Sequence, residues 1–198
     1  VQDLLFHLPF RYEDRTRVHQ IGNIEVGEHV QLQGEILSSN IQFGRRRSLH
    51  CVLQDDTGFI SLRFFHFSAA QKKSLAPGQL IRCYGEARRG RSGMEIYHPE
   101  YKVMADFDSI PVAESLTPVY PATEGLQQAR LRSVINQALS LMEQSPAVQD
   151  YLPAEMVKRL KLDSLADAVS LLHKPPIEAP LSWTSAGVNP GQKRLAFE

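Results

Sequence analysis

The chain has 198 residues, of which 42% are hydrophobic and 22% are charged. This composition is close to the average of soluble globular proteins and excludes a disordered tail or a fibrous repeat. The length suits one large core, or a barrel of about 100 residues with a helical appendage, and we expect the second arrangement. Lys plus Arg and Asp plus Glu number 22 each. An overall positive field for nucleic acid is therefore excluded, and any electrostatic argument rests on local clusters.

Neither the cysteines nor the apolar runs indicate secretion or a membrane. Cys51 and Cys83 lie far apart, each within an apolar run, which suits neither a disulfide framework nor a zinc site. We expect both thiols to be buried and reduced. No run approaches the roughly 18 consecutive apolar residues of a membrane span. Both ends of the chain fall inside apolar helical patterns, so we expect a segment of a longer protein, in which the missing signal peptide says little.

The first half of the chain begins with a helix and continues as strands. Apolar spacing in residues 1–8 predicts a short helix that Pro9 ends, within a lead-in of residues 1–28. From residue 29 the apolar period changes to two, as at Val30 and Leu32, which predicts strands. The predicted strands end near residue 104 and comprise a first strand from about 29, then 49–54, 59–65, about 80–87 and about 94–104.

Turn and cap residues separate these strands. The Asp55–Gly58 sequence is typical of a tight hairpin turn. Residues 68–76 have helix-forming composition, with Ser68 as N-cap and Pro77 and Gly78 as the stop. The order of three strands, a short helix and two strands is that of the five-stranded Greek-key oligonucleotide-binding (OB) barrel. The fold class is therefore α+β and mainly β, with the barrel over residues 29–104.

After the barrel the pattern becomes helical. An extended, Pro-rich link over 105–125 precedes a helix predicted at 126–144, whose apolar face holds Leu131, Ile135, Ala138 and Met142. Two shorter helices complete a helical segment that ends at 174, one at about 153–160 and one from the N-cap Ser164 to the Pro175-Pro176 stop. Residues 175–198, rich in Pro, Gly and Ser up to residue 192, are predicted to be a linker.

Several motifs that suggest chemistry have simpler explanations. Residues 85–92 have the glycine spacing of a phosphate loop, but Arg stands where Lys is needed, and a strand rather than a helix follows. Asp55 and Asp56 belong to the predicted turn, without a third ligand nearby. His50, His66 and His98 lack metal-ligand spacing and are expected to be structural or surface residues. We expect no catalytic site and no cofactor in this segment.

Arginines cluster in two predicted hairpin loops. Arg45, Arg46 and Arg47 lie between the first two strands, and Arg88, Arg89 and Arg91 lie between the last two. Alone, each run is typical of a solvated turn. In an OB barrel, however, these two loops flank the ligand-binding face, which favours contacts with DNA phosphates.

Aromatic residues end the third strand. Alternation places Ile60, Leu62 and Phe64 on one face, and Phe65 on the polar face with Arg63. A ring beside an arginine can stack on an unpaired base, and Arg63 is a further candidate for a phosphate contact. The alternative is that Phe65 and Phe67 pack beneath the following helix.

The chain resembles the RecG branched-DNA helicases. The matching segments run in family order along the whole chain: residues 1–15, 63–70, 98–101, 116–125, 172–176 and 192–198. The most specific are the strings Leu-Pro-Phe-Arg-Tyr-Glu-Asp at 8–14 and Leu-Thr-Pro-Val-Tyr-Pro at 116–121. In this family the OB barrel is the wedge domain.

The resemblance implies a function for the larger protein. That protein would be an ATP-driven DNA translocase, an ATP hydrolase using ATP and Mg²⁺ in a motor beyond residue 198, which remodels replication forks and Holliday junctions in replication restart, recombination and repair. The wedge would split the duplex at the branch point. By the family pattern Phe65 stacks on a base, with Phe64 beside it. A second aromatic of some relatives is replaced here by Ala69, and Phe67 is a possible substitute.

Two alternatives remain open at this stage. The barrel is either a generic single-stranded-DNA-binding OB domain or an OB module that docks a protein, for example single-strand-binding protein. For the lead hypothesis we expect branched DNA as the partner, no membrane contact, a monomer, and the bacterial cytoplasm with the nucleoid as the location.

Overall fold

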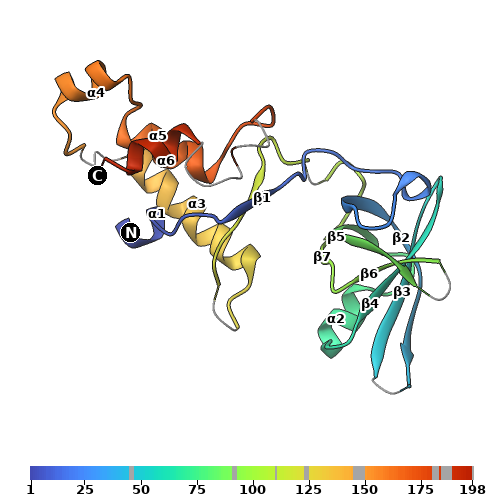
Figure 1. The fold of residues 1–198 in the computed structure, drawn as a ribbon. Coiled ribbons are helices and arrows are strands. Elements are labelled where there is room, and N and C mark those ends of the chain that lie inside the picture. The colour runs from blue at the N-terminus through green and yellow to red at the C-terminus, as the bar shows by residue number, and fades with distance from the viewer. Residues whose placement is uncertain are drawn as a thin grey trace. The chain divides into compact units, whose positions relative to one another are not determined.

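The computed structural model describes residues 1–44, 47–90, 93–109, 111–122, 125–144, 150–179, 183 and 189–197. The chain divides into two compact units, drawn in Figure 1. The barrel unit is Arg15–Ala113, and the helical unit combines Val1–Asp14 with Glu114–Glu198. No helix in the described ranges has the length and apolar character needed to cross a membrane.

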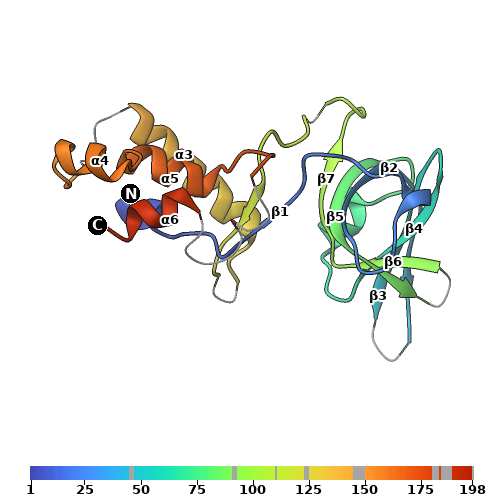
Figure 2. The same cartoon turned by 45° about the horizontal axis from the view of Figure 1, so that its top comes forward.

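The barrel unit is built on a single closed sheet, seen as a ring in Figure 2. Its strands are β2 (His29–Gln42), β3 (Ser48–Asp55), β4 (Gly58–Phe64), β5 (Leu80–Gly90), β6 (Gly93–Tyr97) and β7 (Glu100–Met104). They are arranged in the order β2-β3-β4-β6-β5-β7, and β2 also pairs with β5, which closes the barrel. The β4–β6 pair is parallel and the others are antiparallel. With the helix α2 (Ala69–Ser74) between β4 and β5, this is the predicted OB barrel.

The long strand β2 closes the barrel because it serves two neighbours. Its first half pairs with β5 from His29 to Glu35, and its second half pairs with β3 from Glu35 to Gln42. A register shift between Ile36 and Ser38 marks the change, as expected of a bulge that bends a strand. Gly34 allows the close approach there, because a Cβ at this position would lie 2.1 Å from the carbonyl oxygen of Gln54.

The core of the barrel follows the predicted alternation. Leu49, Cys51 and Leu53 on β3 and Ile60 and Leu62 on β4 are fully buried. Both cysteines are free and buried, as expected. The predicted turn is also confirmed, since the Asp55 carboxylate accepts hydrogen bonds from the backbone of Thr57 and Gly58. Ser68 caps α2 by accepting from the Gln71 N–H at 3.1 Å.

The strand predicted over residues 94–104 is in fact two strands. β6 ends at Tyr97 and β7 begins at Glu100, because His98 adopts a left-handed backbone with φ of 47° and Pro99 has no N–H for a ladder. After this turn β7 pairs with β5 as a sixth strand outside the closed ring. A 3-10 helix, η1 (Ile21–Asn23), precedes the barrel.

The helical unit has its own core, formed by the apolar face of α3 (Gln128–Gln144) with α1 (Gln2–Leu5) and α5 (Leu165–His173). α1 is shorter than the predicted helix over residues 1–8, whereas α4 (Ala154–Leu160) and α5 agree with the predicted helices. The Ser164 cap is confirmed by its bond from the Asp167 N–H. A two-stranded ribbon of β1 (Arg11–Glu13) and β8 (Thr117–Val119) completes the unit.

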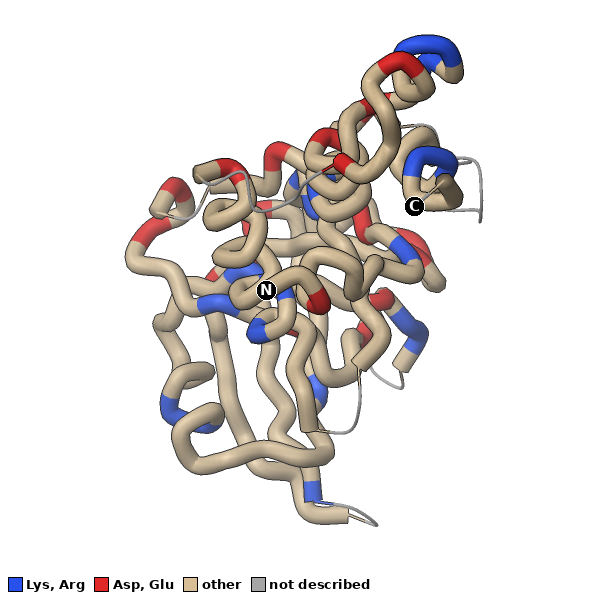
Figure 3. Tube along the Cα trace, turned by 90° about the vertical axis from the view of Figure 1, so that its left-hand side faces the viewer, with Lys and Arg blue, Asp and Glu red and all other residues tan. Residues whose placement is uncertain are grey.

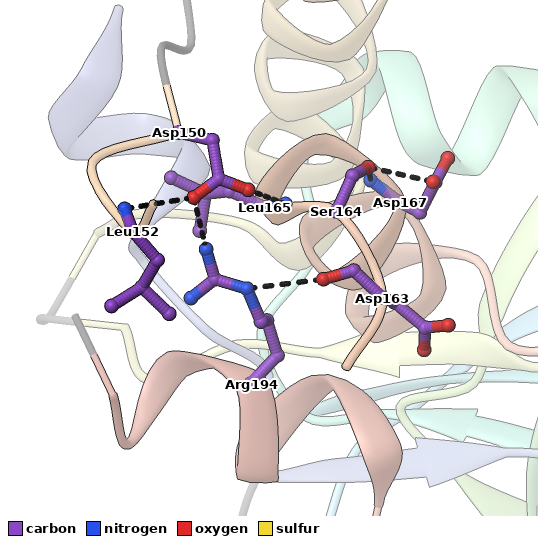
Figure 4. Close-up of polar contacts among 7 residues, drawn as sticks. All are labelled: Asp150, Leu152, Asp163, Ser164, Leu165, Asp167 and Arg194. Atoms are coloured by element: carbon purple, nitrogen blue, oxygen red, sulfur yellow. Dashed lines mark hydrogen bonds and ion pairs between the residues drawn. The ribbon is translucent and has the colours of Figure 1, made fainter. Parts of the chain in front are cut away.

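The segment predicted as a linker contains a packed helix, α6 (Pro190–Leu195). Its Arg194 is fully buried and forms an ion pair with Asp150 at 2.6 Å, while its Nε donates to the carbonyl of Asp163 at 3.0 Å (Figure 4). The Asp150 carboxylate also accepts from the N–H groups of Leu152 and Leu165. This network connects α6 to the start of α5.

A second buried network joins three parts of the helical unit. The Tyr120 hydroxyl lies 2.8 Å from Nδ1 of His173, and Nε2 of His173 lies 2.8 Å from the carbonyl oxygen of Leu5. A carbonyl only accepts, so Nε2 carries a proton and donates it to Leu5, and in the neutral ring Nδ1 accepts from the Tyr120 hydroxyl. Burial lowers the pKa of His173, although the bond to Leu5 opposes this effect. Burial at this position therefore favours the neutral imidazole.

Candidate nucleic-acid interface

Neighbouring strands bring their polar residues together at one end of the barrel. His50 on β3 is paired with Arg63 on β4, and Arg63 is paired with Tyr97 on β6. On each of these strands the neighbouring position belongs to the core, as with Leu49 and Phe64. The row His50, Arg63 and Tyr97 therefore faces outward across three strands.

Aromatic side chains lie close together at the end of this row. Phe65, one residue beyond β4, contacts Tyr97 edge-on, with 5.4 Å between ring centroids, and His98 at 5.5 Å. His66 stacks on His98 at 6.1 Å. We call Phe65, His66, Tyr97 and His98 the aromatic cluster. Phe65 is half-buried and the other three are exposed, so the cluster offers ring surface to solvent.

A cation lies beside the aromatic cluster. The guanidinium of Arg88 lies 5.8 Å from the centre of the Tyr97 ring, a distance at which cation–π attraction operates. Arg88 also pairs with Glu86 at 2.6 Å, and this hydrogen bond lowers the pKa of Glu86. Both side chains are accessible to water, so a phosphate can compete for the guanidinium.

Arg63 has a partner within the barrel. Its Nη2 donates to Oε1 of Glu95 at 3.0 Å, and only 4% of the Glu95 side chain is exposed. The pair lies next to His50, whose pKa is lowered by burial and then by the charge of Arg63. The predicted phosphate contact at Arg63 therefore competes with a buried carboxylate.

The two neighbours of Phe65 are less available to a base. Phe64 is 2% exposed, with edge contacts to His98 and Tyr101, so its ring has no free face for the predicted stacking. Phe67 is half-buried against the barrel core, beneath the guanidinium of Arg47 at 4.9 Å. The packing alternative thus describes Phe67 better than a stacking role. Ala69 is exposed as the first residue of α2.

The predicted arginine tips are only partly described. Arg47, Arg88 and Arg89 are exposed at the bases of the two hairpins, whereas Arg45, Arg46 and Arg91 lie outside the described residues. Elsewhere acidic and basic positions are interspersed along the chain (Figure 3). Among the described residues no group of three or more His, Cys, Asp or Glu side chains could hold a metal ion.

Sequence reasoning missed Tyr97, His66 and His98 as members of the site. The histidines were expected to be structural or surface residues, yet the structure stacks His66 on His98. The signal was present in the OB strand order, because that topology pairs the third and fifth strands in parallel and so brings the ends of β4 and β6 together.

Comparison with known proteins agrees with this architecture. A model of the RecG wedge domain matches residues 1–142. The ATP-dependent DNA helicases RecG of Escherichia coli K12 and Haemophilus influenzae are 46% and 42% identical to the chain over 198 residues. The chain spans 28% of the length of each.

A solved structure of RecG bound to a three-way DNA junction shares the fold, with a TM-score of 0.70 and 24% identity. That match covers 98% of this chain and 25% of the RecG chain. The wedge-domain match covers most of the present chain. The chain therefore belongs to the RecG wedge domain family.

Proposed function

We propose that this chain binds branched DNA and is the strand-separating wedge of an ATP-dependent helicase that acts in replication restart, recombination and repair. The observation that carries the proposal is the aromatic cluster, with Arg88 beside it, at the end of the barrel where β4 and β6 meet. Membership of the wedge family and similarity to RecG helicases support it. ATP, Mg²⁺ and the motor belong to the larger protein.

The proposed mechanism is passive. The Phe65 ring stacks on the base pair exposed at the branch point, and such stacking contributes about 1 to 3 kcal/mol per base. One step of DNA stacking is worth about 1.4 kcal/mol on average. A single ring is therefore strong enough to hold a frayed terminal pair apart while a motor supplies the directional work.

The arginines have a different task in this mechanism. Arg47, Arg88 and Arg89, together with Arg45, Arg46 and Arg91 in the tips, bind backbone phosphates and set the orientation of the branch. Such contacts release counterions, so affinity should fall with salt by a log–log slope of about −0.9 per phosphate neutralised on duplex DNA. Arg63 has a weaker case than the others, because it already pairs with Glu95.

The test is a titration of the 198-residue chain with a three-way fork, a linear duplex and a single strand of equal length. We expect the fork to bind tightest and Phe65→Ala to weaken fork binding by about 1 to 3 kcal/mol. Phe59→Ala is the matched control, because Phe59 is 66% exposed at the opposite end of β4. Equal affinity for the three DNAs, or equal effects of the two variants, contradicts the wedge.

A generic single-strand-binding barrel is the second candidate, and the aromatic cluster favours it to the same degree because rings stack on any base. Tightest binding to the single strand would identify this alternative. A response that is flat in salt would instead favour a docking module for single-strand-binding protein. For the wedge we further propose a monomer in the bacterial cytoplasm, associated with the nucleoid. By itself the chain should hydrolyse no ATP in the presence of fork DNA.

A further inference from the structure

His98 occupies a special place in the turn between β6 and β7. Its backbone is left-handed, with φ of 47°, a conformation that histidine adopts more readily than most residues. Its N–H donates to the carbonyl oxygen of Arg63 at 2.9 Å, which extends the parallel contact of β4 and β6 by one residue. The ring contacts Phe64, Phe65 and His66. The His98 ring thus contacts three successive rings, from the last residue of β4 to the second residue after it.

The side chain of His98 also holds the backbone of Phe65. The Phe65 N–H donates to Nε2 of His98 at 3.2 Å. Phe65 lies just past the last β4 residue, Phe64, so this bond replaces the strand ladder at the position that carries the exposed ring. An N–H donor needs a lone pair on its partner, so Nε2 is unprotonated and the neutral ring carries its proton on Nδ1.

We infer that His98 is the positioning residue for Phe65, whose backbone and ring it holds in the aromatic cluster through its neutral imidazole. The relevance of this contact to DNA rests on the proposed function, but the contact itself does not. A protonated Nε2 cannot accept the Phe65 N–H, so acid should release Phe65 from its position.

The surroundings of His98 favour the neutral form. Burial, and then the neighbouring His66, lower the pKa of His98 from the ordinary histidine value of 6.5. The charged or titratable groups on the packed elements are Arg63 on β4, Glu95 and Tyr97 on β6, and Glu100, Tyr101 and Lys102 on β7. Arg63 pairs with Glu95, Glu100 with Arg15, and the Tyr101 hydroxyl with Ser74. The ring should therefore be neutral at pH 7.

The contact is tested without DNA by following the Phe65 amide in the 198-residue chain by NMR between pH 7.5 and 4.5. In the wild type we expect the amide proton to shift in one step that tracks the His98 ring, with its midpoint below 6.5. His98→Gln, which keeps an acceptor that does not titrate, should remove the step. His66→Gln is the control and should keep the step but move it to higher pH. If the chemical shift of the Phe65 amide proton does not follow the His98 titration, the inference is overturned.

A second variant tests what the bond does for DNA. His98→Phe fills the same space without an acceptor, and we expect it to lower fork affinity about fivefold to tenfold, the effect of one lost hydrogen bond. It should add no further loss to Phe65→Ala, whereas His98→Gln should bind almost as wild type does. If Phe65→Ala weakens fork binding and His98→Phe does not, the positioning role is refuted.

Different results would refute the stacking role of Phe65 and the positioning role of His98. If Phe65→Ala binds forks as tightly as the wild type, the stacking role fails, and the amide titration still decides whether His98 holds Phe65. A dispersed NMR spectrum of each variant verifies that the barrel is folded.

Discussion

Replacement of Arg63 by methionine tests whether this residue serves Glu95 or DNA. The guanidinium lies 3.0 Å from a carboxylate whose side chain is 4% exposed, so its removal leaves a buried charge without a cation. A hydrogen bond to a charged group contributes about 1.5 to 3 kcal/mol, and the loss of one partner from a fully buried pair costs about 3 to 5 kcal/mol. Because 25% of the Arg63 side chain is exposed, water can partly replace it. We expect Arg63→Met to lower the free energy of unfolding of the barrel by about 2 to 4 kcal/mol.

The double variant Arg63→Met, Glu95→Met is the matched control. Replacement of both partners by apolar side chains of similar volume is often close to neutral, so it should recover most of the lost stability. The assay is hydrogen exchange of the slowest amides on β3 and β4, which reports the unfolding free energy of the barrel. A single variant that costs less than about 1 kcal/mol, or a double variant as unstable as the single, refutes this reasoning. If the stable double variant binds forks more weakly than the wild type, the predicted contact of Arg63 with a DNA phosphate is supported.

Three further outcomes follow from the packing. The pKa of His173 is lowered in the folded state, so its neutral form stabilises the helical unit above pH 6.5, and that stability is lost as the pH falls. The melting temperature of the chain should therefore drop between pH 7 and 5. The drop should be smaller in His173→Gln. Gly191→Ala should cost about 1 to 3 kcal/mol by overpacking, because the added Cβ would lie 2.7 Å from the carbonyl oxygen of Ala168; chemical denaturation measures this, and an unchanged midpoint contradicts it. Burial raises the pKa of Cys83 to about 12, and it also raises the pKa of Cys51. A thiol reagent should therefore label both cysteines only at the rate at which the barrel unfolds. Rapid labelling of the native chain would contradict their burial.

The sequence predicts best where one physical signal decides the structure. Period-two alternation identified β3 and β4, because the apolar side chains on one face of each strand are buried. Ser68 and Ser164 marked the starts of α2 and α5, since a hydroxyl that accepts from the first turn is a local interaction.

Predictions failed where distant parts of the chain decide the structure. α6 was mistaken for a linker although Asn189 and Pro190 form a good helix start, because what stabilises a six-residue helix is the burial of Arg194 against Asp150. The single strand predicted at 94–104 ignored the backbone of His98. Phe65 was predicted from its polar face, but Tyr97 and His98 become its neighbours only through the β4–β6 pairing, which no local pattern reveals.

That parallel pairing also determines when the aromatic cluster exists. Phe65 and His98 are 33 positions apart in the chain, and between them lie α2 and the whole of β5. Contacts of such separation must first overcome the entropy of a long closed loop, so they form late in folding. A nascent or partly unfolded barrel therefore displays separate aromatic residues but no assembled cluster. If the cluster binds DNA as proposed, fork affinity should appear in one cooperative step with barrel closure, and a chain that has not closed its barrel should not bind forks.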